Sequence, residues 1–252
     1  MPKVIEEAQI LSHDAPIAGV DILTLAAPQI AQLSLPGQFV QVSVPVSGGF
    51  LRRPLGIAEV SRTDGWIRLI YRQVGRGTEA LAGAAAGAYV SVLGPLGRGF
   101  DTALSHPLLV GGGMGLTPLL FFAAAHPNVS VLMGGRTKEE VFWEEIYRPH
   151  VRECFITTDD GSYGTQGFVT TLLPELLNGG TYDGIAVCGP PVMMERVAGI
   201  ASEYGIPCEV SLEKRMACGL GACLSCAVDT KSGRRKVCKD GPVFPAGEVY
   251  YA

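Results

Sequence analysis

Hydrophobic and polar residues alternate in short runs along the first hundred residues. Period-two alternation occurs at residues 38–44, 66–74 and 88–97, and each run follows a turn built on Pro-Gly, Asp-Gly or Gly. Such runs between turn residues are typical of antiparallel strands, and several of them within a hundred residues indicate a small closed barrel. We therefore predict an antiparallel β-barrel domain over residues 1–100.

From about residue 101 the pattern changes to short apolar runs that alternate with helix-like segments. The expected strands are residues 106–110, 128–135, 153–160, 184–189 and 207–212, and the expected helices are residues 117–126, 137–146, 168–177 and 190–205. Buried strands that alternate with amphipathic helices predict a mostly parallel sheet with both faces covered. We assign residues 101–211 to a doubly wound α/β domain.

The last piece, residues 212–252, is rich in Gly, Lys and Arg. About 40 residues of this composition are too few to be held together by a hydrophobic core alone. We therefore expect a third, small domain that another kind of interaction stabilises.

Composition and charge narrow the possible functions. The chain has 252 residues, 47% of them hydrophobic, with a formal net charge of -4, so it has no general attraction to nucleic acids. The start "MPKVIEEAQILS" lacks the basic and apolar regions of a secretory signal. Residues 102–135 carry no Asp, Glu, Lys or Arg, but three consecutive glycines and a Thr-Pro pair favour a strand, turn and helix over a membrane span. We expect a soluble cytoplasmic protein without membrane association.

Four of the seven cysteines form one pattern near the C-terminus. Cys218, Cys223, Cys226 and Cys238 are spaced C-x4-C-x2-C-x11-C, the plant-type ferredoxin arrangement for a 2Fe-2S cluster. The small residues "GLGA" between the first two cysteines let backbone N–H groups approach the cluster sulfurs. The spacing predicts that these four thiolates hold two irons and thereby stabilise the small C-terminal domain.

Zinc is the alternative for the same cysteines. Structural zinc sites usually carry paired C-x2-C knuckles, and here Cys223 and Cys226 form one such knuckle without a second. A zinc-stabilised nucleotide-binding module without redox activity therefore remains open. The other cysteines, Cys154, Cys188 and Cys208, stand singly at predicted strand ends and are expected to be buried and inert.

Two glycine-containing turns follow predicted parallel strands. In "LLVGGGMGLTP", Thr117 is the expected N-cap and Pro118 the expected first helical residue, while Leu116 stands where a G-x-G-x-x-G fingerprint has its last glycine. The second turn, Cys188-Gly189-Pro190, ends a later strand. Open α/β sheets bind ligands at the carboxyl ends of their strands, so the two turns predict one nucleotide site, although a tight turn alone also explains the glycines.

Charged residues between these turns bear on the choice of nucleotide. Asp159 and Asp160 should repel a 2′-phosphate and favour NAD over NADP, whereas Arg136 argues weakly for NADP. In the barrel, Arg53 can hold a phosphate bidentately, and Gly77-Thr78 can add a backbone N–H and a hydroxyl. A solvated strand edge is the alternative for these arginines.

Taken together, the three pieces resemble the ferredoxin-NADP reductase superfamily, with a flavin barrel, a pyridine-nucleotide domain carrying GGGxGxxP and CGPP, and an attached 2Fe-2S segment. More narrowly, "SLEKRMACGLGACLSCAV" and "KVCKDGPVFPAGEV" resemble the electron transfer subunits of dihydroorotate dehydrogenase B. The resemblance covers essentially the whole chain.

The resemblance implies an NAD-linked oxidoreductase subunit of pyrimidine biosynthesis. A partner subunit with FMN, in a heterotetramer of two copies of each chain, would oxidise dihydroorotate and send electrons through the 2Fe-2S cluster and FAD of this chain to NAD+. The resemblance implies FAD contacts by Arg53, Pro54, Leu55, Gly56, Ile70, Tyr71, Arg72, Gly77 and Thr78. It implies an NAD site formed by Gly111, Gly112, Gly113, Met114, Gly115, Thr117, Pro118, Cys188, Gly189 and Pro190.

One residue departs from the family's flavin motif. That motif commonly ends in Ser or Thr, whereas this chain has Gly56.

Other side chains bear less directly on the function. The four histidines lie in dissimilar contexts and no Ser-His-Asp group is evident, so acid–base catalysis on a substrate by this chain is not expected. The basic stretch "KSGRRKVCK" predicts a solvated hairpin, with a partner-docking face as the alternative. Flavin subunits of a sulfhydrogenase or of an NADPH-linked ferredoxin reductase remain alternative functions.

Overall fold

The computed structural model describes residues 2–44 and 51–251. They divide into two compact units, and the chain passes between these units more than once. The first, here called the barrel unit, comprises residues up to 99 together with 213–228 and 235–242. The second, the sheet unit, comprises 100–212, 229–234 and the residues from 243 onward. The C-terminal piece thus contributes to both units, and its four predicted ligand cysteines all belong to the barrel unit.

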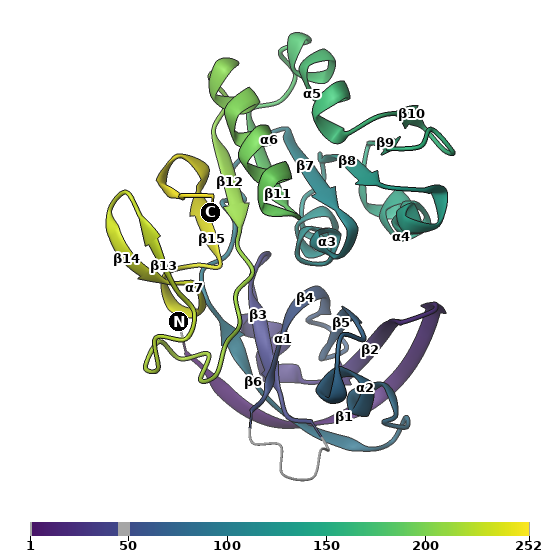
Figure 1. Cartoon of the computed structure of the whole chain (residues 1–252). Coiled ribbons are helices and arrows are strands. Elements are labelled where there is room, and N and C mark those ends of the chain that lie inside the picture. Colours follow the sequence, from purple (N-terminus) through teal and green to yellow (C-terminus); the bar gives the residue numbers. More distant parts are fainter. Residues whose placement is uncertain (1, 45–50, 252) are drawn as a thin grey trace. The chain divides into compact units, whose positions relative to one another are not determined.

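Six antiparallel strands close the barrel, in the order β1-β2-β5-β4-β3-β6 (Figure 1). Apolar side chains on alternate strand positions fill it; Leu23, Leu25, Val40, Ile67 and Leu69 have no exposed surface. The predicted barrel is confirmed. It forms because apolar and polar residues alternate along the strands of the first hundred residues, so that one face of each strand fills the interior. The elements are β1 (Val4–Ile17), β2 (Val20–Ala26), α1 (Pro28–Leu33), β3 (Phe39–Val42), β4 (Arg53–Ser61), β5 (Trp66–Arg72), α2 (Arg76–Ala82) and β6 (Tyr89–Leu96).

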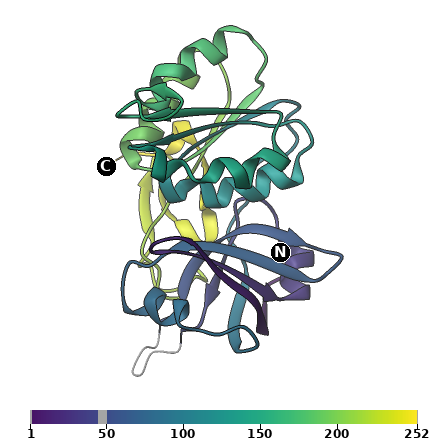
Figure 2. The ribbon, with the colours of Figure 1, turned by 90° about the vertical axis from the view of Figure 1, so that its right-hand side faces the viewer.

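The sheet unit contains a seven-stranded sheet in the order β10-β9-β8-β7-β11-β12-β15, in which only β15 runs antiparallel to its neighbour. The strand order reverses at β7, so α3 and α4 lie together on one face and α5 and α6 on the other (Figure 2). The doubly wound fold is thereby confirmed. Its strands are β7 (Pro107–Gly112), β8 (Ser130–Gly135), β9 (Glu153–Thr158), β10 (Thr165–Gln166), β11 (Gly184–Cys188), β12 (Cys208–Ser211) and β15 (Val243–Pro245), and its helices are α3 (Leu116–Ala125), α4 (Trp143–Tyr147), α5 (Val169–Asn178) and α6 (Pro191–Glu203).

Two helix predictions need correction. α3 begins at Leu116, directly after a 3-10 turn at Gly113–Gly115 that carries the chain into the helix, so Thr117 is not the N-cap and Pro118 is not the first helical residue. The expected helix at 137–146 is instead a 3-10 turn at Lys138–Val141 followed by α4. Val141 and Trp143 are both buried, and residues two apart cannot share one face of a regular α-helix.

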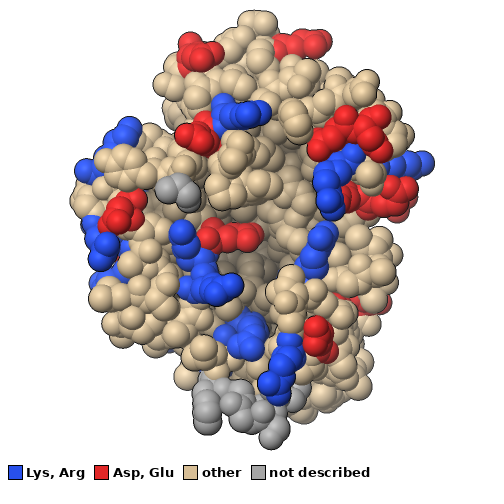
Figure 3. Space-filling model, in the orientation of Figure 1, with Lys and Arg blue, Asp and Glu red and all other residues tan. Residues whose placement is uncertain are grey.

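The chain ends in a small hairpin and short turns. The hairpin pairs β13 (Ala227–Thr230) with β14 (Gly233–Lys236), and α7 (Val237–Asp240) follows it. Its basic residues are largely exposed, as expected, and Arg234 forms an ion pair with Asp229 at 3.0 Å. Lys and Arg side chains gather over this region in Figure 3. Shorter 3-10 turns lie at Arg148–His150 and Ala246–Glu248.

Within residues 2–44 and 51–251, no helix is both long and apolar enough to cross a membrane.

Candidate cofactor-binding sites

The cysteine loop, residues 217–226, and α7 carry the four predicted ligands, and all four belong to the barrel unit. Cys226 and Cys238 are buried, Cys218 is half-buried and Cys223 is exposed. Gly219 and Gly221 have φ angles of +68° and +85°, the left-handed region that glycine adopts without strain. Leu224 has a φ of 61°, which is uncommon for a residue with a side chain. The loop therefore has a tightly turned backbone that the small residues of "GLGA" allow.

Hydrogen-bond donors surround the thiol sulfurs. The N–H of Leu220 lies 3.3 Å from Sγ of Cys218, and the hydroxyl of Ser225 lies 3.1 Å from Sγ of Cys223. The Ser225 hydroxyl and N–H lower the pKa of Cys223 to about 6. Burial raises the pKa of Cys218, but N–H donors from the loop outweigh this and lower it. Since a thiol must lose its proton to bind a metal, these contacts prepare Cys218 and Cys223 as ligands.

The thiols interact in two pairs. Cys218 shares a hydrogen bond with Cys223, and the Cys238 N–H lies 3.5 Å from Sγ of Cys226. Burial, followed by contact with Cys226, raises the pKa of Cys238 to about 12. In the described part of the chain, no group of three or more His, Cys, Asp or Glu side chains is arranged to hold a metal ion. A 2Fe-2S cluster takes four thiolates, and this part of the chain supplies four cysteines with N–H and hydroxyl donors beside their sulfurs. The chemistry of these donors fits the cluster.

The cysteine loop and the segment after α7 pack on the barrel. A Cβ on Gly219 would lie 2.8 Å from both Cγ and Nε2 of Gln41, and a Cβ on Gly97 would lie 2.5 Å from Cδ of Pro242. The N–H of Arg98 donates to the Gly241 carbonyl at 2.5 Å. Gln41 is fully buried, and neither polar atom of its side-chain amide has a hydrogen-bond partner.

Arg53 at the start of β4 lies against Gly77 in the first turn of α2. The guanidinium atoms Nε, Nη2 and Cζ occupy the space that a Cβ on Gly77 would need. The structure thus brings together two predicted phosphate contacts that are separate in sequence. The Thr78 hydroxyl, by contrast, donates to the Gly75 carbonyl at 3.0 Å and accepts from the Val74 N–H at 2.9 Å. The hydroxyl shapes the turn here, and its use as a phosphate donor stays a prediction.

The other predicted flavin contacts lie on β4 and β5. Leu55, Ile70 and Tyr71 are buried, whereas Arg72 is exposed. Successive strand residues face opposite sides, so the side chain of Tyr71 cannot face the same side as those of Ile70 and Arg72. The buried Tyr71 hydroxyl has no hydrogen-bond partner, and burial raises its pKa. Pro54 and Gly56 are half-buried and pair with Gln41 and Phe39 of β3.

The two glycine turns of the sheet unit meet at the point where the strand order reverses. Gly111 pairs with Cys188 across β7 and β11. A Cβ on Gly115 would collide with the Cys188 carbonyl and would lie 2.7 Å from the Gly189 nitrogen. The Cys188 side chain points elsewhere, since Sγ donates to the Ser211 carbonyl at 3.5 Å. Backbone, and not the thiol, therefore lines this predicted nucleotide site, together with Gly112, Gly113, Met114 and Pro190 in the same turns.

The charged residues expected to select the nucleotide lie at the carboxyl ends of β8 and β9. The N–H groups of Asp159 and Asp160 donate to the carbonyls of Gly135 and Arg136 at 3.0 and 3.3 Å. Glu140 accepts from the Arg136 N–H at 3.0 Å and from its Nε at 2.8 Å, and these contacts raise the pKa of Arg136. The charge of Arg136 is therefore already neutralised by Glu140. This weakens the argument that Arg136 binds the 2′-phosphate of NADP.

Comparison with known proteins agrees with this geometry. Residues 213–250 match the family described as the iron-sulfur cluster binding domain of dihydroorotate dehydrogenase B. The chain is 40% identical over 236 residues to the dihydroorotate dehydrogenase B (NAD(+)) electron transfer subunit of Desulforamulus reducens, covering 89% of this chain and 90% of that one. The subunit of the same name from Geobacillus thermodenitrificans is 41% identical over 239 residues, with 90% and 91% covered.

The chain belongs to the family of dihydroorotate dehydrogenase B electron transfer subunits.

Among solved structures, this family member is similar to a chain of an NADH-dependent reduced ferredoxin-NADP oxidoreductase studied for flavin-based electron bifurcation. The TM-score is 0.88 at 30% identity, over 98% of this chain and 90% of that chain. The same two-part fold therefore occurs in a second flavin-linked complex.

Three residues of this chain that the sequence analysis did not identify lie at these sites. Gln41 lies against the cysteine loop, Glu140 holds Arg136, and the Met193 sulfur would lie 2.9 Å from a Cβ on Gly112. Only Glu140 carried a signal, because a carboxylate four residues after an arginine is a common ion-pair spacing. Gln41 and Met193 become significant only through tertiary contacts.

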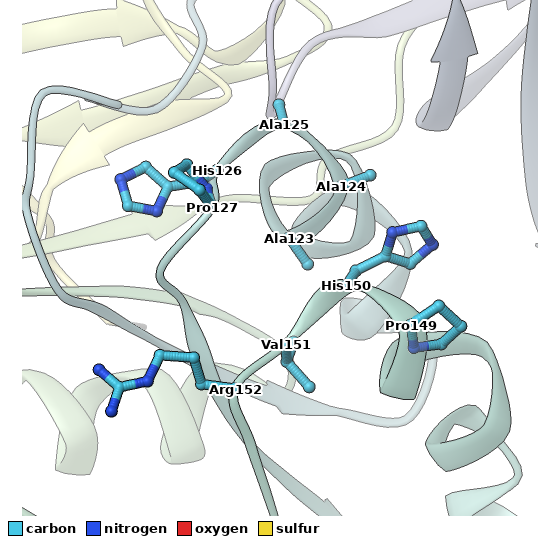
Figure 4. Close-up of a pocket in the computed structure, with 9 residues that line it drawn as sticks. All are labelled: Ala123, Ala124, Ala125, His126, Pro127, Pro149, His150, Val151 and Arg152. Atoms are coloured by element: carbon cyan, nitrogen blue, oxygen red, sulfur yellow. The ribbon is translucent and has the colours of Figure 1, made fainter.

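A depression of about 400 Å³ at the opposite, amino-terminal edge of the sheet is not part of these sites (Figure 4). Its two imidazoles, those of His126 and His150, point away from each other. A ring nitrogen of His126 is hydrogen-bonded to the Leu104 carbonyl at 2.8 Å. His126 therefore makes a structural contact with the backbone at this edge.

Proposed function

We propose that this chain is the electron transfer subunit of an NAD-linked dihydroorotate dehydrogenase. The partner subunit oxidises dihydroorotate to orotate at FMN, and this chain passes the two electrons to NAD+, which with one proton becomes NADH. The observation that carries the proposal is the pairing of four ligand cysteines with a barrel in one compact unit, in a chain whose relatives over nine-tenths of its length carry this name.

The chain's residues fit the cofactors that this function requires. When bound, the 2Fe-2S cluster supplies one-electron transfer, and FAD supplies the change from single electrons to the hydride that NAD+ accepts. Cys218, Cys223, Cys226 and Cys238 hold the cluster. The residues proposed for the cluster and for the flavin belong to the same unit, which supports an electron path within one folded body.

Arg53 and Gly77 form the centre of the proposed flavin site. The guanidinium provides charge and paired donors for a phosphate, and Gly77 leaves room for it. Ile70, Tyr71, Arg72, Pro54, Leu55 and Gly56 complete the site on β4 and β5 as backbone and packing contacts. Because Gly56 has no hydroxyl, its backbone N–H is the group offered where related flavin motifs have Ser or Thr.

The turns at Gly111–Gly115 and Cys188–Pro190 form the proposed NAD site. Small residues allow the two backbones to approach each other and a pyrophosphate closely. Asp159 and Asp160 place negative charge beside Arg136, where a 2′-phosphate would be repelled. The site therefore accepts NAD in preference to NADP.

Electrons enter at the exposed part of the cysteine loop. Cys223 is exposed, and Leu220 and Leu224 on either side of it are 44% and 56% exposed. Exposed apolar residues around a redox ligand are typical of a docking surface. We assign the FMN-containing catalytic subunit to this surface, in an assembly of two copies of each chain in the cytoplasm.

The test is anaerobic purification of this chain alone and after co-expression with the catalytic subunit from the same source. We expect iron, acid-labile sulfide and FAD in the chain, and dihydroorotate-dependent NADH formation only in the complex. One zinc without sulfide would instead establish the zinc-stabilised module. Light scattering of the complex measures the stoichiometry.

A second function is favoured by the 30% identical chain from an NADH-dependent reduced ferredoxin-NADP oxidoreductase. In that case the chain would co-purify with the subunits of a ferredoxin-linked complex and would support no dihydroorotate-dependent NADH formation. Capture of a tagged chain from its native cells, followed by identification of the bound subunits, distinguishes the two.

A further inference from the structure

Gln41 is a buried amide that the described protein leaves without a partner. It lies in β3, has no exposed surface, and both Nε2 and Oε1 lack a hydrogen bond. Burying an unpaired amide is unfavourable by about 1–3 kcal/mol. Groups of this kind in native proteins are usually completed by a water, an ion or a ligand.

The position of Gln41 indicates which ligand completes it. Val40 and Val42 are core residues of the barrel, and alternation therefore puts Gln41 on the outer face of β3. There its Nε2 would lie 2.8 Å from a Cβ on Gly219, the residue after Cys218. The backbone of Gln41 is in register with Pro54 in the proposed flavin-binding strand. The amide thus faces the cysteine loop from a strand that neighbours the strand of the flavin motif.

We propose that the Gln41 side chain is a positioning residue for the 2Fe-2S cluster and donates an N–H from Nε2 to a cluster sulfur on the Cys218 side. This inference rests on the proposed function. Hydrogen bonds to sulfur stabilise the more negative, reduced cluster and so raise its reduction potential. Gln41 therefore helps to set the reduction potential at which the cluster accepts electrons from the partner and passes them to the flavin.

Gln41→Met tests the proposal because methionine has nearly the same length and no donor. We expect an intact cluster whose reduction potential, measured by EPR-monitored titration, is more negative. The expected change is about fivefold in the equilibrium constant for reduction, the size of one hydrogen bond, which is about 40 mV for a one-electron couple. The FAD potential should not change, and Gln41→Asn or Gln41→His should recover part of the shift.

Gln38→Met is the matched control. Gln38 is also a buried amide at the start of the same segment, but it is paired: Oε1 accepts from the Leu35 N–H at 2.8 Å, and Nε2 donates to the Gly97 carbonyl at 2.7 Å. Its replacement should lower thermal stability without changing the cluster potential. Gln41→Met should leave the stability of the cluster-free protein equal or higher, since it removes an unpaired amide.

The outcomes separate the two proposals. Wild-type protein without a 2Fe-2S EPR signal would overturn the proposed function itself. A normal signal in both proteins with identical cluster potentials would overturn only the role of Gln41. A shift of the FAD potential with an unchanged cluster potential would also overturn it, because the amide would then serve the flavin.

Discussion

The guanidinium of Arg53 fills the space beside Gly77 that any other residue would use for its side chain. Two residues far apart in sequence are therefore interdependent, since the arginine can take this position only while residue 77 remains glycine.

This relationship predicts that Gly77→Ala and Arg53→Ala have similar consequences. Either change should weaken FAD binding by about tenfold to a hundredfold, the range expected for lost charged hydrogen bonds to phosphate. FAD titration of the flavin-depleted protein, followed by fluorescence, measures this. Gly83→Ala at the end of α2 is the control, because a Cβ there meets nothing closer than 3.5 Å. Full flavin affinity in Gly77→Ala would contradict the assignment.

Gly219→Ala should reduce cluster content. A side chain at a φ of +68° is strained by roughly 1–2 kcal/mol, and its Cβ would also press on Gln41. We expect lower iron and sulfide per chain and a faster loss of the visible absorbance in air. Gly233→Ala has similar backbone strain, at a φ of +101°, but open space around it. If both variants lost the cluster equally, contact with Gln41 would not be the cause.

Gly115→Ala should damage the nucleotide site without affecting the cluster. The new methyl group would collide with backbone atoms of Cys188 and Gly189, and overpacking of this kind destabilises by about 1–3 kcal/mol. We expect a higher KM for NADH in dye reduction and a lower Tm, with unchanged iron content. Gly199→Ala within α6 meets no atom within 4 Å and should leave KM unchanged. An unaltered KM in Gly115→Ala would place the nucleotide elsewhere.

Glu140→Gln should relax the preference for NAD. The change removes the carboxylate that neutralises Arg136, so the guanidinium becomes available to a 2′-phosphate. The ratio of kcat/KM for NADPH to that for NADH should rise by up to about fivefold, the upper end of what an exposed charge contributes. Glu139→Gln, whose carboxylate contacts Thr137 instead, should leave the ratio unchanged. A constant ratio in both variants would exclude Arg136 from nucleotide choice.

Leu220→Glu should weaken assembly with the catalytic subunit. A carboxylate at position 220, beside Cys223, would lose its hydration in the interface. We expect the affinity for the catalytic subunit, measured by calorimetry, to fall about tenfold. Leu11→Glu changes an equally apolar residue on β1 that is 48% exposed, and it should assemble normally. Normal assembly of Leu220→Glu would move the docking surface away from the cysteine loop.

Much of this organisation could be predicted from sequence because local patterns determine it. Period-two alternation gave the barrel strands, apolar runs between helices gave the doubly wound sheet, and the spacing of Cys218 to Cys238 gave the cluster. Each of these signals lies within one continuous segment, where covalent spacing limits the possible geometry.

The errors arose where distant or competing contacts decide. Thr117 resembles an N-cap, but a preceding 3-10 turn begins the helix earlier. Alternation puts Gln41 on the outer, polar face of its strand, and only the return of the cysteine loop buries it there. No local pattern carries that information.

The barrel unit combines residues up to 99 with residues 213–228 and 235–242, and most of the sheet unit lies between these parts in the sequence. During synthesis the barrel strands leave the ribosome first, and the four cysteines leave it last. The complete set of four ligands for iron and sulfide is therefore available only when translation is nearly complete. A premature stop codon between Leu212 and Cys238 would leave the barrel strands and strands β7 to β12 in place but would remove at least one of the four ligand cysteines.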